Sequence, residues 1–104
     1  MHKLIVFYPH PDNPEEFMDY YVNRHLSEIN KFPGLISASY GQVEDEESPY
    51  FLFFEGVWRN GAELNDALNS EVGQALLADV PNYSPKGATM VTLDVKEVDL
   101  SQER

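Results

Sequence analysis

Residues 3–8 read KLIVFY and residues 13–32 read NPEEFMDYYVNRHLSEINKF, and these two stretches predict a strand followed by a helix. The first is dense in β-branched and aromatic residues, which favour strands. In the second, Asn13 is a suitable N-cap and Pro14 suits the first helical position. We expect the helix to end before Phe32, because a residue that precedes a proline avoids helical backbone angles.

The predicted helix has one apolar half, and a titratable residue, His25, lies near the centre of that half. The apolar residues there are Phe17, Met18, Tyr21, Val22, Leu26, Ile29 and Phe32. A buried imidazole needs hydrogen-bond partners, because each polar group left unpaired costs about 1–3 kcal/mol. Tyr21, one turn earlier on the same face, is the nearest candidate partner. Two interpretations stay open: His25 is a core histidine bonded to a backbone carbonyl, or it lines a pocket and transfers a proton.

Further elements follow from the same kind of pattern. Residues with a helical period are interrupted at Asn69-Ser70, where Ser70 suits a second N-cap. A stretch rich in aromatic residues predicts the most hydrophobic strand. The expected elements are strands at 35–43, 50–58 and 88–98, a helix at 62–79, turns at 44–49 and 80–87, and a frayed tail at 99–104.

The resulting order, β-α-β-β-α-β in 104 residues, predicts an α+β, ferredoxin-like fold. Both helices then cover one face of a four-stranded antiparallel sheet. Both faces of the sheet are apolar: Leu4, Val6 and Tyr8 against Ile5 and Phe7 in the first strand, and Tyr50, Leu52, Phe54 and Trp58 against Phe51, Phe53 and Val57 in the third. A monomer would expose more than the few hundred Å² of apolar patch usual for soluble proteins. We therefore expect a homodimer in which two sheets pack together.

Composition limits the classes of function. The chain of 104 residues has material for a single domain over 1–104, and 18 acidic against 7 basic residues give a net charge of −11. That charge disfavours nucleic acid and anionic membrane surfaces as partners. The sequence has no cysteine, no signal-peptide pattern and no apolar run of the roughly 20 residues that a membrane helix needs. We expect a small soluble protein of the cytoplasm.

Metal and cofactor sites are not predicted. The histidines are His2, His10 and His25, and no pair of them has the spacing of a preformed zinc site. No glycine-rich phosphate loop is present, and the acidic turn at 44–49 lacks the ligand spacing of a calcium loop. Glu55 and Asp94 are expected to face solvent or to pair with basic neighbours, Arg59 or Lys96.

Several segments together resemble the EthD family over nearly the whole chain. They are Lys3 to Pro9, Phe17 with Asp19-Tyr20-Tyr21 and His25-Leu26, Pro33-Gly34-Leu35, and Asp79 to Ser84. The resemblance implies a dimeric α/β barrel, a superfamily that includes cofactor-free monooxygenases, isomerases, cyclases and haem-dependent enzymes. It carries over Tyr21, His25, Asn82 and Tyr83 as the recurring positions. Ser27 departs from the family, which commonly has proline there.

Two functions are consistent with these residues and this resemblance. The first is a cofactor-independent oxidoreductase or isomerase that acts on a small hydrophobic or aromatic metabolite. Its catalytic residues would be His25, as general acid or base, and Tyr21, with Asn82 and Tyr83 binding the ligand.

The second function is a hydrophobic-ligand-binding or accessory protein of a catabolic or biosynthetic pathway, without chemistry of its own. Phe51, Phe53 and Trp58 would then form the pocket or the dimer core, and His25 would fix one polar end of the ligand. Core packing is the ordinary role of such strand aromatics.

Overall fold

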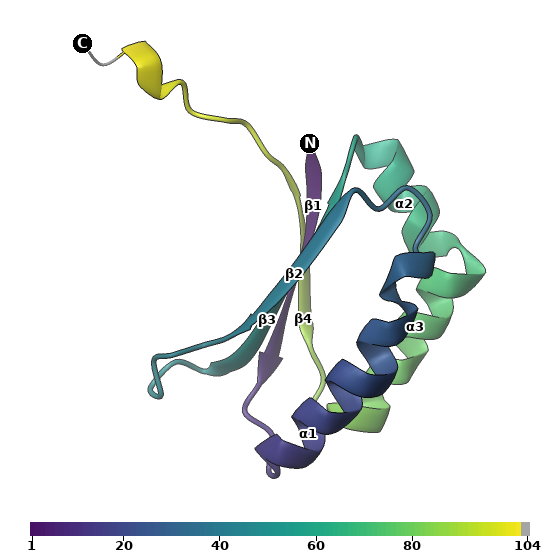
Figure 1. Ribbon diagram of the computed structural model, residues 1–104, viewed down its shortest axis with the longest axis vertical. Helices are drawn as coiled ribbons and strands as arrows, with labels where there is room; N and C mark the ends of the chain where they lie inside the picture. The colour runs from purple at the N-terminus through teal and green to yellow at the C-terminus, as the bar shows by residue number, and fades with distance from the viewer. Residues whose placement is uncertain (103–104) are drawn as a thin grey trace.

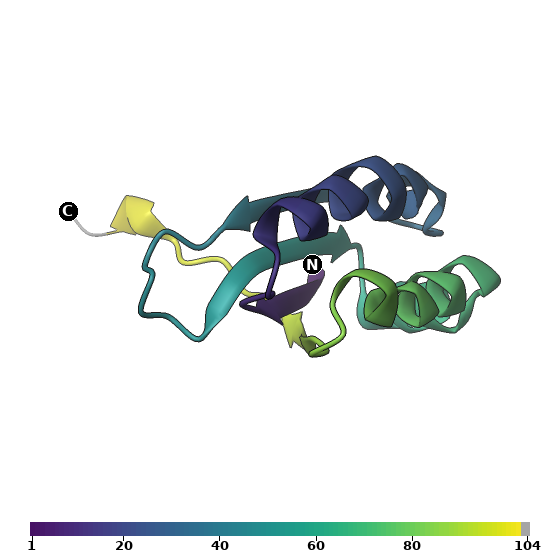
Figure 2. The same ribbon diagram turned by 90° about the horizontal axis from the view of Figure 1, so that it is seen from below.

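In a computed structural model that describes residues 1–102, a four-stranded antiparallel sheet of order β2-β3-β1-β4 is covered by helices on one face (Figures 1 and 2). The strands are β1 (His2–Pro9), β2 (Ser37–Gln42), β3 (Tyr50–Trp58) and β4 (Thr89–Asp94). The predicted α+β, ferredoxin-like architecture is therefore confirmed. The outer strands β2 and β4 are shorter than expected, whereas β3 has the expected bounds.

The first helical region begins as predicted but is not one continuous α-helix. It consists of α1 (Pro14–Tyr20), a π-helical turn η1 (Tyr21–His25) and a 3₁₀ segment η2 (Leu26–Lys31). The Asn13 side chain caps α1 by accepting a hydrogen bond from the Glu16 amide. Further along, the Ser27 hydroxyl donates to the Arg24 carbonyl at 2.6 Å, and such local side-chain bonds compete with the α-helical ladder.

The second helical region is divided as expected, into α2 (Gly61–Asn69) and α3 (Glu71–Tyr83). Ser70 caps α3 by accepting from the Gly73 amide. The prediction of a turn from residue 80 was wrong, because α3 continues through Pro81 to Tyr83. Proline removes one backbone donor from the helix, but the continued helix buries Tyr83 in the core.

A β-bulge changes which aromatic side chains of β3 face the helices. Tyr8 pairs with Leu52 and Pro9 with Tyr50, so Phe51 is the additional residue in the ladder. The Phe51 ring turns toward the helices, whereas Tyr50 stacks on Phe7, a side chain of the opposite face. The predicted alternation, with Tyr50 and Leu52 on one face and Phe51 on the other, was therefore wrong at this end of the strand.

Charged strand residues and the C-terminal segment complete the fold. Asp94 pairs with Lys96 at 3.2 Å, as expected, whereas Glu55 pairs with Lys3 at 3.4 Å. Where a frayed tail was expected, Leu100–Gln102 form a 3₁₀ turn, η3, and residues 103–104 lie outside the described part of the chain. Within that described part, no helix has the length and apolar character needed to cross a membrane.

Candidate functional site

The π-helical turn η1 directs Tyr21 and His25 toward the sheet. Its register is set by the Leu26 amide, which donates to the Tyr21 carbonyl. The Tyr21 ring is fully buried, His25 is 6% exposed, and the two rings stack with centroids 5.5 Å apart. Single π-helical turns occur frequently at functional sites. The predicted inward direction of His25 is confirmed.

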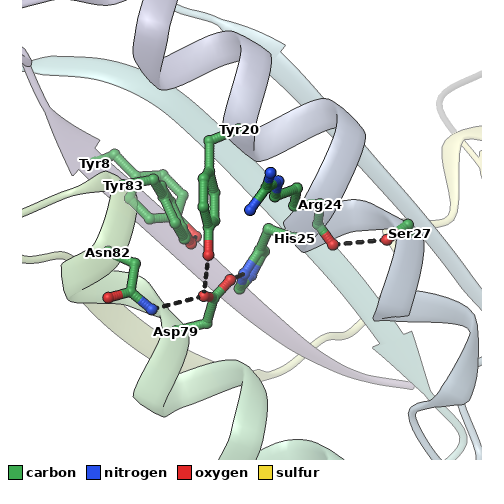
Figure 3. Close-up of polar contacts among 8 residues, drawn as sticks. All are labelled: Tyr8, Tyr20, Arg24, His25, Ser27, Asp79, Asn82 and Tyr83. Atoms are coloured by element: carbon green, nitrogen blue, oxygen red, sulfur yellow. Dashed lines mark hydrogen bonds and ion pairs between the residues drawn. The ribbon is translucent and has the colours of Figure 1, made fainter.

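The partner of His25 is Asp79 of α3, not Tyr21 as predicted. The His25 Nδ1 atom lies 2.9 Å from Asp79 Oδ2 (Figure 3). The other carboxylate oxygen, Oδ1, accepts hydrogen bonds from the Tyr20 hydroxyl at 2.7 Å and from the Asn82 side-chain amide at 3.0 Å. Asp79 therefore joins three donors from two helical regions and fixes the orientation of the imidazole ring.

The electrostatics of this pair favour a neutral histidine beside an ionised aspartate. Burial lowers the pKa of His25, and Asp79 offsets this only in part. Burial alone would raise the pKa of Asp79, but the hydrogen bonds from Asn82, Tyr20 and His25 outweigh it and lower this pKa below its ordinary value. An ionised carboxylate only accepts, so the hydrogen bond assigns the His25 proton to Nδ1. Nε2 then presents a lone pair, and within residues 1–102 it makes no hydrogen bond.

A cavity of about 30 Å³ separates His25 from the sheet, and we call it the His25 cavity. Its lining is otherwise mainly apolar and comes from β1, β3, β4, η1, η2 with its C-cap, α2 and α3: Leu4, Val6, Tyr8, Tyr21, His25, Ile29, Phe32, Phe54, Leu68, Leu76, Leu77, Val80 and Met90. The volume is close to that of one water molecule.

The hydroxyl group of Tyr21 is the unusual polar atom of this region. It is buried and, among the described residues, lacks a hydrogen-bond partner. It lies near enough to the Tyr8 phenol for that group to help raise the pKa of Tyr21, although burial is the main cause. The Tyr8 hydroxyl bonds instead to the Tyr83 hydroxyl at 2.7 Å, and the Tyr83 ring lies 4.8 Å from the His25 ring.

Two open grooves flank the Tyr20–Asp79 contact. One, of about 390 Å³, lies between the β1–α1 loop and the end of α3 and is lined by Tyr20, Asn82 and Tyr83 among others. The other, which we call the interhelix groove, has about 520 Å³ and is lined by Tyr20, Arg24, Glu28, Lys31, Glu71, Val72, Ala75, Leu76 and Asp79. Leu76 borders both the interhelix groove and the His25 cavity.

The predicted site residues divide into two groups. Tyr21, His25 and Tyr83 come together, and Asn82 approaches them through Asp79. The predicted strand aromatics Phe51, Phe53 and Trp58, in contrast, do not line the His25 cavity. The Phe51 ring contacts Phe17 at 5.3 Å in the core, Phe53 lies beside Phe7 on the sheet face away from the helices, and Trp58 is fully buried with its N–H donating to the Pro33 carbonyl.

Asp79, Tyr20 and Tyr8 were not predicted as site residues. Asp79 had a weak signal, because it lies three residues after Leu76 and therefore near the apolar face of its helix. Its pairing with His25 joins residues 54 positions apart, which helical spacing does not reveal.

Comparison with known proteins supports the fold. No family model matches the sequence. An uncharacterized 11.0 kDa protein of the thcB-thcC intergenic region of Rhodococcus erythropolis is 29% identical over 101 residues, which cover 94% of this chain and 98% of that protein. The crystal structure of an EthD family protein from Bacillus halodurans superposes with a TM-score of 0.86 and 24% identity, covering 92% of this chain and 99% of the other. The chain has the fold of an EthD family protein.

More distant structures share the EthD-like fold. A dimeric ferredoxin-like protein of unknown function from Jannaschia has a TM-score of 0.68 and 18% identity, covering 90% of this chain and 97% of its own. SnoaB, a cofactor-independent oxygenase from Streptomyces nogalater, has a TM-score of 0.65 and 13% identity, with 93% of both chains covered. Proteins of different function thus share this fold, so the function of this chain has to be inferred from the residues of the site.

Proposed function

We propose that this EthD-like protein is a cofactor-independent enzyme of the oxidoreductase or isomerase type that acts on a small hydrophobic or aromatic molecule. The observation that supports this most is the His25 ring, which lines an apolar cavity, has Nδ1 held by Asp79 and makes no hydrogen bond through Nε2 to the described residues. A base oriented by a carboxylate is a recurring catalytic arrangement. The similarity in fold to a cofactor-independent oxygenase is consistent with it.

The proposed first step is transfer of a proton from a C–H or O–H group of the substrate to His25 Nε2. The lowered pKa keeps the imidazole neutral at pH 7, and it can therefore accept that proton. Asp79 then stabilises the imidazolium. The substrate becomes an enolate or phenolate, whose oxygen accepts a hydrogen bond from the Tyr21 hydroxyl, which is buried and unpartnered in the described chain. An isomerase would return the proton at another atom of the substrate. An oxygenase would instead use O₂ as the oxidant, so that one oxygen atom becomes a carbonyl on the deprotonated carbon and the other leaves as water with the two hydrogens of that carbon.

Access to Nε2 requires movement, because a cavity of about 30 Å³ is too small for an aromatic substrate. The interhelix groove reaches the same side chain, Leu76, from outside. We therefore propose that substrate enters between η2 and α3 when Leu76 moves.

We also propose that the protein is a homodimer. The sheet face away from the helices carries Ile5, Phe7, Phe53, Val57, Val91 and Leu93, and the last two are 41% and 43% exposed. A structure of the same fold is a dimeric protein, and covering this face with a second copy removes the apolar surface from water. The cytoplasmic location stays a prediction.

Proton exchange in D₂O tests the enzymatic proposal without knowledge of the later steps. NMR would follow the loss of acidic C–H signals in a panel of aromatic ketones and phenols with the wild-type protein and with His25→Ala. A positioned base contributes about 10²–10⁴-fold, so exchange should fall by that factor. His10→Ala, at an exposed loop histidine bonded to the Ser48 carbonyl, is the matched control and should exchange like wild type. Equal exchange by His25→Ala and wild type would contradict the proposal.

The alternative is an accessory or hydrophobic-ligand-binding protein whose ligand would occupy one of the open grooves. The small volume of the His25 cavity favours this alternative over chemistry at Nε2, because a substrate does not fit beside that ring without movement. Native mass spectrometry of the purified protein distinguishes the two. A dimer that retains a ligand, with no exchange of any compound in the panel, would replace the enzymatic proposal by the binding one.

A further inference from the structure

Arg24 differs from every other basic side chain in residues 1–102. Lys3, Lys31, Arg59, Lys86 and Lys96 each have a carboxylate within 4.0 Å, whereas Arg24 has none. Carboxylates are abundant in this chain, with 18 acidic residues against 7 basic ones. Glu28, one turn after Arg24, would be a natural partner, but it pairs with Lys31 at 2.8 Å. The guanidinium of Arg24 is therefore available to a ligand.

The position of Arg24 relates it to the candidate site. Its guanidinium carbon lies 5.5 Å from the centroid of the Tyr20 ring, whose hydroxyl donates to Asp79. Figure 3 shows the Arg24 side chain extending toward the Tyr20 ring. Arg24 also lines the interhelix groove, which shares Leu76 with the His25 cavity.

The other charged groups of the groove are already engaged, with one exception. Asp79 accepts three hydrogen bonds, and Glu28 is paired with Lys31. The exception is Glu71, which lies in the first turn of α3, where the helix dipole stabilises a negative charge. Apart from Tyr20, the remaining lining is apolar: Val72, Ala75 and Leu76. The groove thus combines a cation that has no carboxylate partner, the Glu71 carboxylate and a hydrocarbon surface.

We propose that the interhelix groove binds small carboxylates with an apolar body and that Arg24 is the residue that selects them. The planar guanidinium presents N–H donors in the geometry of a carboxylate. The apolar body of the ligand lies on α3 toward Leu76. This inference rests on the proposed function for one point, that the groove is the route to His25, and it names the substrate class of that route.

Binding of 1-naphthoate and of its neutral analogue 1-naphthamide tests the proposal. Amide chemical shifts of the protein would be followed in NMR titrations at low salt. Wild type should bind the carboxylate at least about tenfold more tightly than the amide, because charge-assisted hydrogen bonds contribute more than neutral ones. Arg24→Gln should lose this preference while binding the amide unchanged, and Arg24→Lys should retain only part of it.

Two further variants make the result specific. Arg59→Gln removes the same charge at an exposed position that pairs with Glu63, and it should keep the wild-type preference. His25→Ala should also keep the preference for the carboxylate, although it should lose proton transfer. The test of carboxylate selection is therefore independent of the test of the proposed function. Equal binding of carboxylate and amide by wild type, or an unchanged preference in Arg24→Gln, would overturn the proposal. An equal loss of the carboxylate preference in Arg59→Gln would also overturn the proposal, because the preference would then depend on the net charge of the protein and not on Arg24.

Discussion

The layer between the helices and the sheet is built differently at its two ends. At one end Trp58 is fully buried, its N–H donates to the Pro33 carbonyl at 2.8 Å, and its ring contacts Phe32. At the other end, Tyr21 is equally buried but its hydroxyl has no partner in the described chain, and the neighbouring His25 leaves Nε2 unbonded. We call these the Trp58 end and the His25 end.

We interpret this difference as a separation of stability from the proposed function. A satisfied tryptophan contributes packing and a hydrogen bond, and nothing at the Trp58 end is left for a ligand. An unpaired buried hydroxyl lowers stability by about 1–3 kcal/mol, and natural proteins retain such groups mainly where function needs them. In the function proposed above, the polar atoms of the His25 end are the ones that a substrate would satisfy.

The largest expected effect is on stability, at the Trp58 end. Trp58→Ala should lower the free energy of unfolding by about 3–5 kcal/mol, because it leaves a cavity under Phe32. Urea unfolding would measure this. Trp58→Phe, which keeps most of the packing, should lose less. A change below about 1 kcal/mol in Trp58→Ala would mean that this end is not the structural part of the layer.

The opposite behaviour is expected at the His25 end. Tyr21→Phe removes a buried hydroxyl that has no partner in the described chain, so the protein should be as stable as wild type or more stable, by up to about 1–3 kcal/mol. Proton exchange of substrate analogues should nevertheless fall. Tyr83→Phe is the matched control, because it breaks the bond to Tyr8 and should lower stability by about 0.5–1.5 kcal/mol. Equal destabilisation by both variants would show that the Tyr21 hydroxyl is satisfied.

The smallest expected effect is a change in the titration of His25. Burial lowers its pKa and Asp79 raises it, so Asp79→Asn should lower the pKa of His25 further. Proton abstraction by neutral His25 should increase as pH rises through this pKa and level off above it. NMR titration of the imidazole in wild type and Asp79→Asn would measure the shift. A higher pKa in the variant would exclude Asp79 as the charge partner of His25.

The sequence predicted those features that depend on local pattern. Asn13 and Ser70 cap their helices as expected, and His25 points inward because its place on the helix follows from a period of 3.6 residues. The His25 side chain keeps this direction although the helical region changes from an α-helix to a π-helical turn and a 3₁₀ segment. Local rules therefore identified the residue but not the register of the helix around it.

Features that depend on distant contacts were not predicted. The bulge at Phe51 arises from the pairing of β1 with β3, and the continuation of α3 through Pro81 depends on the burial of Tyr83. The Asp79 carboxylate meets His25 only after the helices pack on the same face of the sheet. A single sequence has no periodic signal for such a pair, so the histidine was assigned without its partner.

The most direct test of this account is the protonation state of the His25 ring, read by nitrogen-15 NMR of the wild-type protein at pH 7. We predict a neutral imidazole with its proton on Nδ1, hydrogen-bonded to Asp79, and with Nε2 unprotonated. That result would establish an oriented base beside the His25 cavity before any substrate is known. A proton on Nε2, or a charged imidazolium at pH 7, would contradict the account.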